Sequence, residues 1–146
     1  MLVRIPQGQL ARKKSFRNFG EFTKSTYPEG TTWADVYADY KNNTRKVKIT
    51  VKANVEAMAP HTHPGYPGFP LITPDVYRAQ LFMEELKNFE RTNEMPNLVY
   101  LFLPANHSVG ATRGYPTPRA MIADNDLALG RVVEAVSKSK FWKETC

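Results

Sequence analysis

The sequence predicts an α/β fold in which mostly parallel strands are flanked by helices. Two amphipathic helical patterns enclose one short, unbroken apolar run, Leu-Val-Tyr-Leu-Phe-Leu, at residues 98–103. Such a run is typical of a strand buried on both faces, as in a parallel sheet. The order strand, helix, strand, helix along the chain is that of an α/β layer fold. We therefore expect residues 98–103 to form a central parallel strand, with Val99, Leu101 and Leu103 almost fully buried.

Two helices are expected beside this strand, and the first should span residues 74–92. Thr73 offers a capping hydroxyl, Pro74 suits the first helical position, and Asp75 lies near the positive end of the helix dipole. The second helix should span residues 119–137. Its apolar side, at helical spacing, is formed by Met121, Ile122, Ala128, Leu129, Val132, Val133 and Val136.

The run Asp124-Asn125-Asp126 falls within the second helix, where three short polar residues are poor helix formers. They could mark a helix start at Asp126, or they could be carboxylates that line a site. At helical spacing, however, the three side chains cannot all face one ligand. We predict a structural role for them.

The first half of the chain predicts shorter elements. Residues 15–22 indicate an extended piece that ends near Gly20, and residues 33–40 indicate a short helix capped by Thr31 or Thr32. Residues 46–51 alternate between polar and apolar types, as in a half-buried strand. The inward side chains of that strand would be Val47, Ile49 and Val51.

The chain of 146 residues suits one domain or a piece of a larger one. We divide it into a basic N-terminal part, residues 1–58, a proline-rich loop, residues 59–74, and a helix–strand–helix part, residues 75–146. The loop holds five prolines, which fit neither a helix nor a central strand. No strand follows the last helix, although an α/β unit normally feeds back into the sheet. We therefore expect a single partial domain whose cut edge allows self-association.

All of the excess positive charge lies in the first third of the chain. Residues 1–50 hold ten basic and four acidic side chains, whereas residues 51–146 hold ten of each. A basic segment with interleaved Phe16, Phe19 and Phe22 can bind nucleic acid. No nucleic-acid recognition motif accompanies it, so we favour a solvated face beside buried aromatic side chains.

Other classes of protein are excluded by what the sequence lacks. Its single cysteine, Cys146, allows neither an intrachain disulfide nor a cysteine-based zinc site. No apolar run approaches the ~18 residues of a membrane span. The first 14 residues contain no apolar stretch of the kind found in secretory signals. The sequence does not assign a compartment.

The strongest candidate site follows the apolar run, at residues 104–108. In open α/β sheets, ligands bind outside the carboxyl ends of the strands. His107 can ligate a metal or donate to a phosphate, and Asn106 can hydrogen-bond to an oxyanion. Arg113 and Arg119 can pair with phosphate oxygens. By position alone, we favour a loop histidine that is hydrogen-bonded to backbone.

A second candidate is His61-Thr62-His63, because alternating histidines on an extended segment can reach one ion. Two ligands are fewer than the four of a structural zinc site, and no third ligand stands nearby. We favour an exposed part of the proline-rich loop over a metal site.

Several segments resemble the phosphoesterase family of the alkaline phosphatase superfamily, in its bacterial branch associated with β-propeller repeats. The resemblance is strongest over residues 95–108 and 114–145, and it extends to residues 17–22, 66–69 and 75–78. It implies a partial alkaline phosphatase-like fold. It also implies hydrolysis of a phosphoester through a phosphoenzyme, assisted by divalent ions such as Zn, Mn, Mg or Ca.

The resemblance assigns roles to residues near the candidate site. The family pattern Leu-Pro-Asn-Asp-His-Thr corresponds to Leu-Pro-Ala-Asn-His-Ser at residues 103–108. His107 then matches the active-site histidine and a metal ligand, whereas Asn106 replaces an aspartate. The family's nucleophile would precede residue 1, and its Asp-His motifs would follow residue 145.

The resemblance therefore predicts an internal fragment of a phosphoesterase, inactive alone. The alternative is a non-catalytic or degenerate binding module with a basic N-terminal face. In the fragment, Trp142 would lack its covering strand and would be exposed.

Overall fold

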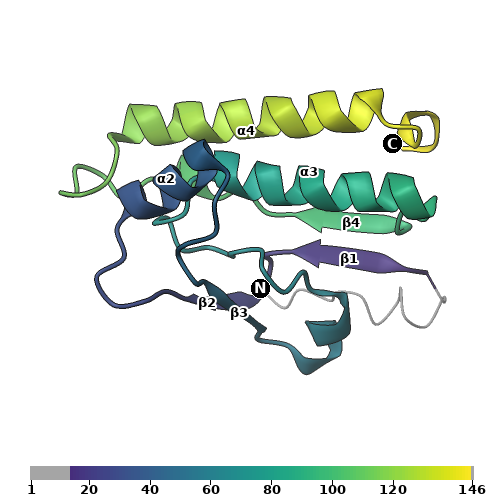
Figure 1. Cartoon of the computed structure of the whole chain (residues 1–146), viewed down its shortest axis with the longest axis horizontal. Helices are drawn as coiled ribbons and strands as arrows, with labels where there is room; N and C mark the ends of the chain where they lie inside the picture. The colour runs from purple at the N-terminus through teal and green to yellow at the C-terminus, as the bar shows by residue number, and fades with distance from the viewer. Residues whose placement is uncertain (1–13, 146) are drawn as a thin grey trace.

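The computed structural model describes residues 14–145, and it mixes helices and short strands in an α/β arrangement (Figure 1). None of the helices in this range has the length and apolarity of a membrane-spanning helix. The elements in chain order are β1 (Phe16–Phe19), β2 (Thr23–Thr26), α2 (Trp33–Asn42), β3 (Thr50–Ala53), the 3-10 helix η1 (Glu56–His61), α3 (Asp75–Thr92), β4 (Leu98–Leu101), the 3-10 helix η2 (Ala105–His107), α4 (Pro118–Lys138) and the 3-10 helix η3 (Trp142–Glu144).

The strands form two small sheets among the described residues. β1 and β4 pair in parallel, with Phe16 opposite Leu98, and β2 and β3 pair antiparallel. α3 lies between α4 and the parallel strands in Figure 1. Arg17 of β1 forms an ion pair with Glu85 of α3 at 2.9 Å, so this face of the parallel sheet meets α3.

β4 differs from the expected central strand. It ends at Leu101, Leu98 and Tyr100 are 39% and 45% exposed, and Val99, Leu101 and Leu103 are only half-buried. The expectation of a strand buried on both faces is therefore wrong. Among residues 14–145, β4 has β1 as its only strand neighbour, and η1 packs against β1, where His61 stacks on Phe16.

α3 is the centre of the core and matches the predicted helix to within one residue. Its start differs from the prediction, because Pro74 is the N-cap and the Thr73 hydroxyl bonds to Tyr27 instead. Asp124 of α4 fills the capping role by accepting the backbone N–H of Asp75 at 2.6 Å. The predicted local cap is thus replaced by a side chain from the other long helix.

α4 begins and ends within one residue of its predicted bounds. Only part of its predicted apolar side is buried, namely Met121, Ala128 and Val132. Ile122, Leu129 and Val133 are each about half exposed, at 50–53%. Beyond the helix, Trp142 is 50% exposed, which confirms the expectation for that residue.

The first half of the chain confirms some predictions and corrects others. Thr32, one of the two predicted capping residues, caps α2 in a capping box with Asp35. The strand predicted at residues 46–51 instead occupies Thr50–Ala53. The cause is Asp39, which accepts the backbone N–H groups of residues 46 and 47 and so removes them from any strand ladder.

The segment around His61 and His63 is folded rather than exposed loop. Residues 59–61, the first three of the predicted proline-rich loop, belong to η1 although they include Pro60. The ring of His61 stacks on Phe16 with centroids 4.0 Å apart, and His63 stacks on Phe19 at 5.4 Å. The two imidazoles therefore pack on different phenylalanines, and the expectation of an exposed loop is wrong here.

Candidate functional site

The predicted site lies where expected, beyond the carboxyl end of β4. η2 places Asn106 and His107 at the surface, while Pro104 and Ala105 just before them are buried. The imidazole of His107 has no hydrogen-bond partner among residues 14–145. Its ring meets the edge of Phe69 with centroids 5.3 Å apart. The site therefore presents an exposed imidazole that rests against one aromatic ring.

Backbone strain follows directly after this histidine. Ser108 has φ 51° and ψ 172°, a conformation that side chains disfavour. Its N–H donates to the carbonyl of Ala105 at 3.0 Å, which holds the turn closed. Strained residues of this kind concentrate at binding and catalytic sites.

A buried carboxylate, Asp75, fixes the backbone that leads into η2. Its Oδ2 accepts the N–H of Ala105 at 2.9 Å and the side-chain amide of Asn125 at 2.8 Å. The same amide donates to the carbonyl of Leu103 at 2.8 Å. Both sides of the bend at Pro104 are thus held by α3 and α4. We call Asp75, Arg78, Asp124 and Asn125 the Asp75 cluster.

Arg78 connects the Asp75 cluster to the loop that carries Phe69. It is fully buried, and its Nη1 pairs with Asp75 Oδ1 at 2.9 Å. Its guanidinium also donates to the carbonyls of residues 67, 68, 70 and 73. This loop comes so close to the end of β1 that a Cβ on Gly68 would lie 2.6 Å from the carbonyl oxygen of Gly20. The loop is therefore held from both sides.

Asp124 completes the cluster in an environment that disfavours its charge. Burial raises the pKa of its carboxyl above the ordinary value, and the nearby Asp75 acts in the same direction. The N–H groups of Asp75 and Val76 oppose this rise. Asp124 and Asn125 thus have structural contacts, as predicted, whereas Asp126 is exposed.

Neither of the two predicted phosphate-binding arginines bonds to His107 within residues 14–145. Arg113 and Arg119 are exposed and make no hydrogen bond or ion pair within residues 14–145. Across the same residues, no group of three or more His, Cys, Asp or Glu side chains could hold a metal ion. His107 and the amide of Asn106 are too few ligands for a divalent ion. The described residues alone do not form the metal site that the resemblance implies.

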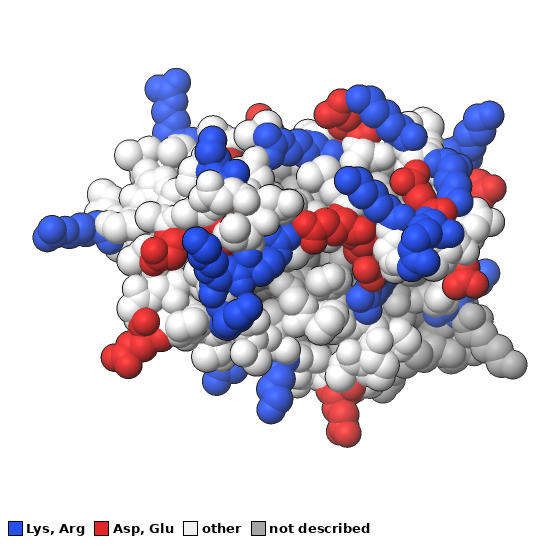
Figure 2. Space-filling view, viewed as in Figure 1, with Lys and Arg blue, Asp and Glu red and all other residues white. Residues whose placement is uncertain are grey.

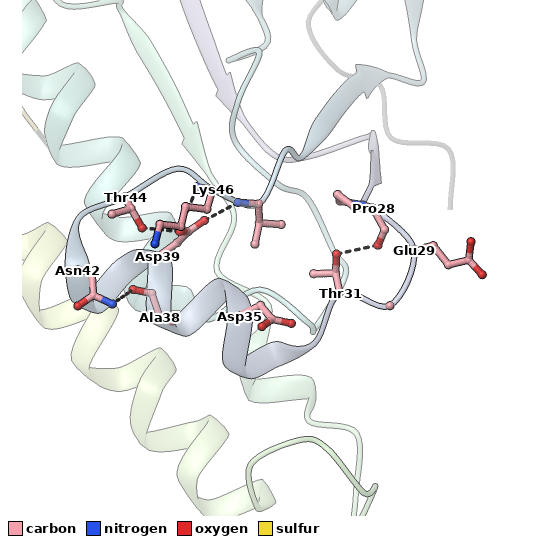
Figure 3. Close-up of a pocket in the computed structure, with 11 residues that line it drawn as sticks. Pro28, Glu29, Thr31, Asp35, Ala38, Asp39, Asn42, Thr44 and Lys46 are labelled. Atoms are coloured by element: carbon pink, nitrogen blue, oxygen red, sulfur yellow. Dashed lines mark hydrogen bonds between the residues drawn. The ribbon is translucent and has the colours of Figure 1, made fainter.

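A separate hollow of about 390 Å³ lies beside α2, between Pro28 and Val47 (Figure 3). Its most buried acid, Asp39, accepts hydrogen bonds from the Thr44 hydroxyl and from two backbone N–H groups. Burial by itself would raise the pKa of Asp39, but these bonds lower it below its ordinary value. The carboxylate of Asp39 is therefore taken up by structural hydrogen bonds within the wall of the hollow.

Charges of both signs are interspersed on the face shown in Figure 2. Two of the basic residues of the first third are neutralised, because Arg17 pairs with Glu85 and Arg45 pairs with Glu84. Phe16 and Phe19 are buried. The preference for a solvated face over nucleic-acid binding stays a prediction from the sequence. Arg12 and Lys13 lie outside the described residues.

Within the Asp75 cluster, the sequence predicts a structural role for Asp124 and Asn125 but does not show that Asp75 and Arg78 are buried. By sequence alone, Asp75 suits the helix dipole, and Arg78 belongs only to the segment 75–78 that resembles the family. The available signal was a pair of opposite charges three residues apart on the apolar face of a helix, which must be paired if buried.

No family model, curated protein or solved structure gives a significant match to this chain.

Proposed function

We propose that this chain is part of a metal-dependent phosphoesterase of the alkaline phosphatase superfamily, with a partial version of that fold. The observation that carries the proposal is the position of His107 in the fold. The segment that resembles the family pattern around its histidine lies at the carboxyl end of a parallel strand, where α/β proteins bind ligands. Its imidazole is exposed, and its backbone is held by buried groups.

In this proposal the chain supplies groups that bind a phosphoester substrate. A neutral imidazole nitrogen of His107 can act as a ligand, and a protonated one can donate to a phosphoryl oxygen. The amide of Asn106 can donate to a second oxygen. Arg113 and Arg119, which are exposed and unpaired within the described residues, can reach phosphate oxygens with forked donors. The nucleophile and the remaining metal ligands would come from outside residues 1–146.

The decisive experiment begins with the flanking DNA. We expect an upstream Ser or Thr segment and a downstream Asp-His segment in frame with this sequence. The product of that frame should hydrolyse an aryl phosphate with Mn²⁺ or Zn²⁺, and His107→Ala should lower kcat/KM by at least about 10²-fold. His61→Ala is the matched control, since that imidazole stacks on Phe16. The absence of these segments, or hydrolysis that ignores His107, would overturn the proposal.

The chain of 146 residues by itself should show no hydrolysis above background in the same assay. A lone histidine cannot supply the charge stabilisation of a two-metal site. Turnover by this chain that disappears in His107→Ala would show that residues 1–146 already contain a complete active site.

Asn106 favours a second candidate, a degenerate binding module. It stands where the family pattern has an aspartate, and an amide is a weaker metal ligand than a carboxylate. Such a module would bind a phosphoester without cleaving it. Inorganic phosphate would then perturb the backbone amide NMR signals of residues 105–108. The product of the longer reading frame would hydrolyse no aryl phosphate with Zn²⁺, Mn²⁺, Mg²⁺ or Ca²⁺.

A further inference from the structure

The groups that hold η2 in place come from two helices and are buried, whereas His107 itself is exposed. We infer that Asn125 and Asp75 are positioning residues for His107. This inference rests on the proposed function for its relevance to catalysis, although the geometry behind it is independent of any activity.

The position of His107 depends first on the bend between β4 and η2. Pro104, at its centre, has no N–H to donate, so the hydrogen bonds from α3 and α4 reach the residues on either side of it. The side-chain amide of Asn125 donates to the carbonyl of Leu103, and the carboxylate of Asp75 accepts the N–H of Ala105. Because these two side chains also bond to each other, they act as one clamp.

The second step is the other wall of the site. The loop that bears Phe69 is held by Arg78, whose guanidinium is paired with the same Asp75 carboxylate. Asp75 thus connects the segment that carries His107 with the loop that carries Phe69. The edge contact between these two rings, at 5.3 Å, depends on both connections.

The third step is that no hydrogen bond to the imidazole orients His107 among residues 14–145. Its backbone N–H bonds to the carbonyl of Pro104, which is itself part of the clamped bend. The imidazole has no hydrogen bond of its own. Loosening the clamp should therefore let the ring leave Phe69, whereas a general loss of stability elsewhere should not.

NMR of the histidine rings of the full 146-residue chain tests the inference. In Asn125→Ala, the NOE between the rings of His107 and Phe69 should be lost, and the His107 ring signals should move toward those of a solvent-exposed histidine. The signals of His61 and His63 should stay in place, because their rings stack on Phe16 and Phe19.

Asn18→Ala is the matched control, since Asn18 is a fully buried amide that donates to Glu21 and Thr62. This variant should shift His61 or His63 and leave His107 unchanged. Asp75→Asn, which keeps the size of the side chain, should weaken the NOE between His107 and Phe69. If Asp75→Asn does not fold, Asn125→Ala decides alone, because Asn125 is only partly buried.

The outcomes separate this inference from the proposed function. Unchanged His107 signals in Asn125→Ala, or an equal change in Asn18→Ala, would overturn the positioning role. Loss of the NOE in a protein whose longer frame has no phosphatase activity would support the positioning role while the proposed function fails. With an active longer frame, Asn125→Ala should lower kcat more than it raises KM.

Discussion

The two long helices run side by side and were predicted equally well, yet their environments differ. α3 buries nine residues on several sides, including a charged pair, whereas α4 buries three. α4 carries a second apolar stripe, Ile122, Leu129 and Val133, that no described element covers. A helix surrounded by its own domain needs no partner, whereas a half-covered apolar helix marks an interaction surface. The difference shows that the described residues enclose α3, whereas they leave one side of α4 exposed.

The position of the stripe around α4 indicates where the open side lies. At 100° per residue, the contacts of α4 follow one another around the helix. Arg131 bonds to Tyr40 of α2, Asp124 bonds to α3, and Asn125 bonds to the carbonyl of Leu103 after β4. The stripe occupies the next quadrant of α4, beyond Asn125, and β4 also has an open edge. There the strand has no partner among residues 14–145.

The largest effect is expected where the closed region is most buried. Arg78→Leu removes a fully buried cation and leaves Asp75 without its ionic partner. Breaking a buried pair in this way costs roughly 3–5 kcal/mol. Urea unfolding would measure the loss. Arg45→Leu is the control, because its pair with Glu84 is exposed and should contribute only about 1 kcal/mol or less.

A smaller effect with a defined pH dependence is expected at Asp39. Because its folded pKa is lowered, its contribution is present above the ordinary value of about 4 and is lost as pH falls through the folded pKa. Asp39→Asn should therefore cost roughly 1–3 kcal/mol at pH 7 and progressively less below pH 4. Unfolding curves from pH 7 to pH 2 would show the two proteins converging. A constant difference over that range would contradict the assignment.

The smallest effects compare two neighbouring residues on α4. Val132 is 9% exposed and Val133 is 53% exposed. Val132→Ala should cost roughly 1–3 kcal/mol of unfolding free energy. Val133→Ala should change it by less than about 0.5 kcal/mol in the isolated chain. Equal losses at both positions would show that the stripe is already covered.

The helices were predictable because their signals are local. Apolar periodicity fixed the extents of α3 and α4, and the Thr32 capping box fixed the start of α2. The cap of α3 was not predictable, because the carboxylate that accepts its first N–H belongs to Asp124, which lies 49 positions away along the chain. The exposure of β4 was missed for a related reason. An apolar run shows what a strand can bury, but not how many neighbours it has.

The candidate site likewise contains residues that the sequence identifies and residues that it does not. His107 could be found because it directly follows an apolar run, and Asn106 because it stands beside it. The side chains that hold them, Asp75 and Asn125, lie 30 and 20 residues away from Ala105 and have no sequence motif of their own. The proline-rich sequence around His61 and His63 predicts a loop, but it does not show that Phe16 and Phe19, more than 40 positions away, stack on the two rings.

The open side of α4 is the central structural claim, and sedimentation of the 146-residue chain combined with thermal unfolding tests it most directly. A half-covered apolar helix and an unpaired strand edge predict a weakly stable protein that self-associates as its concentration rises. Replacing Leu129 with Ser should reduce that association. A monodisperse monomer with a sharp, cooperative melt at ~45–65 °C, typical of complete mesophilic domains, would contradict the account.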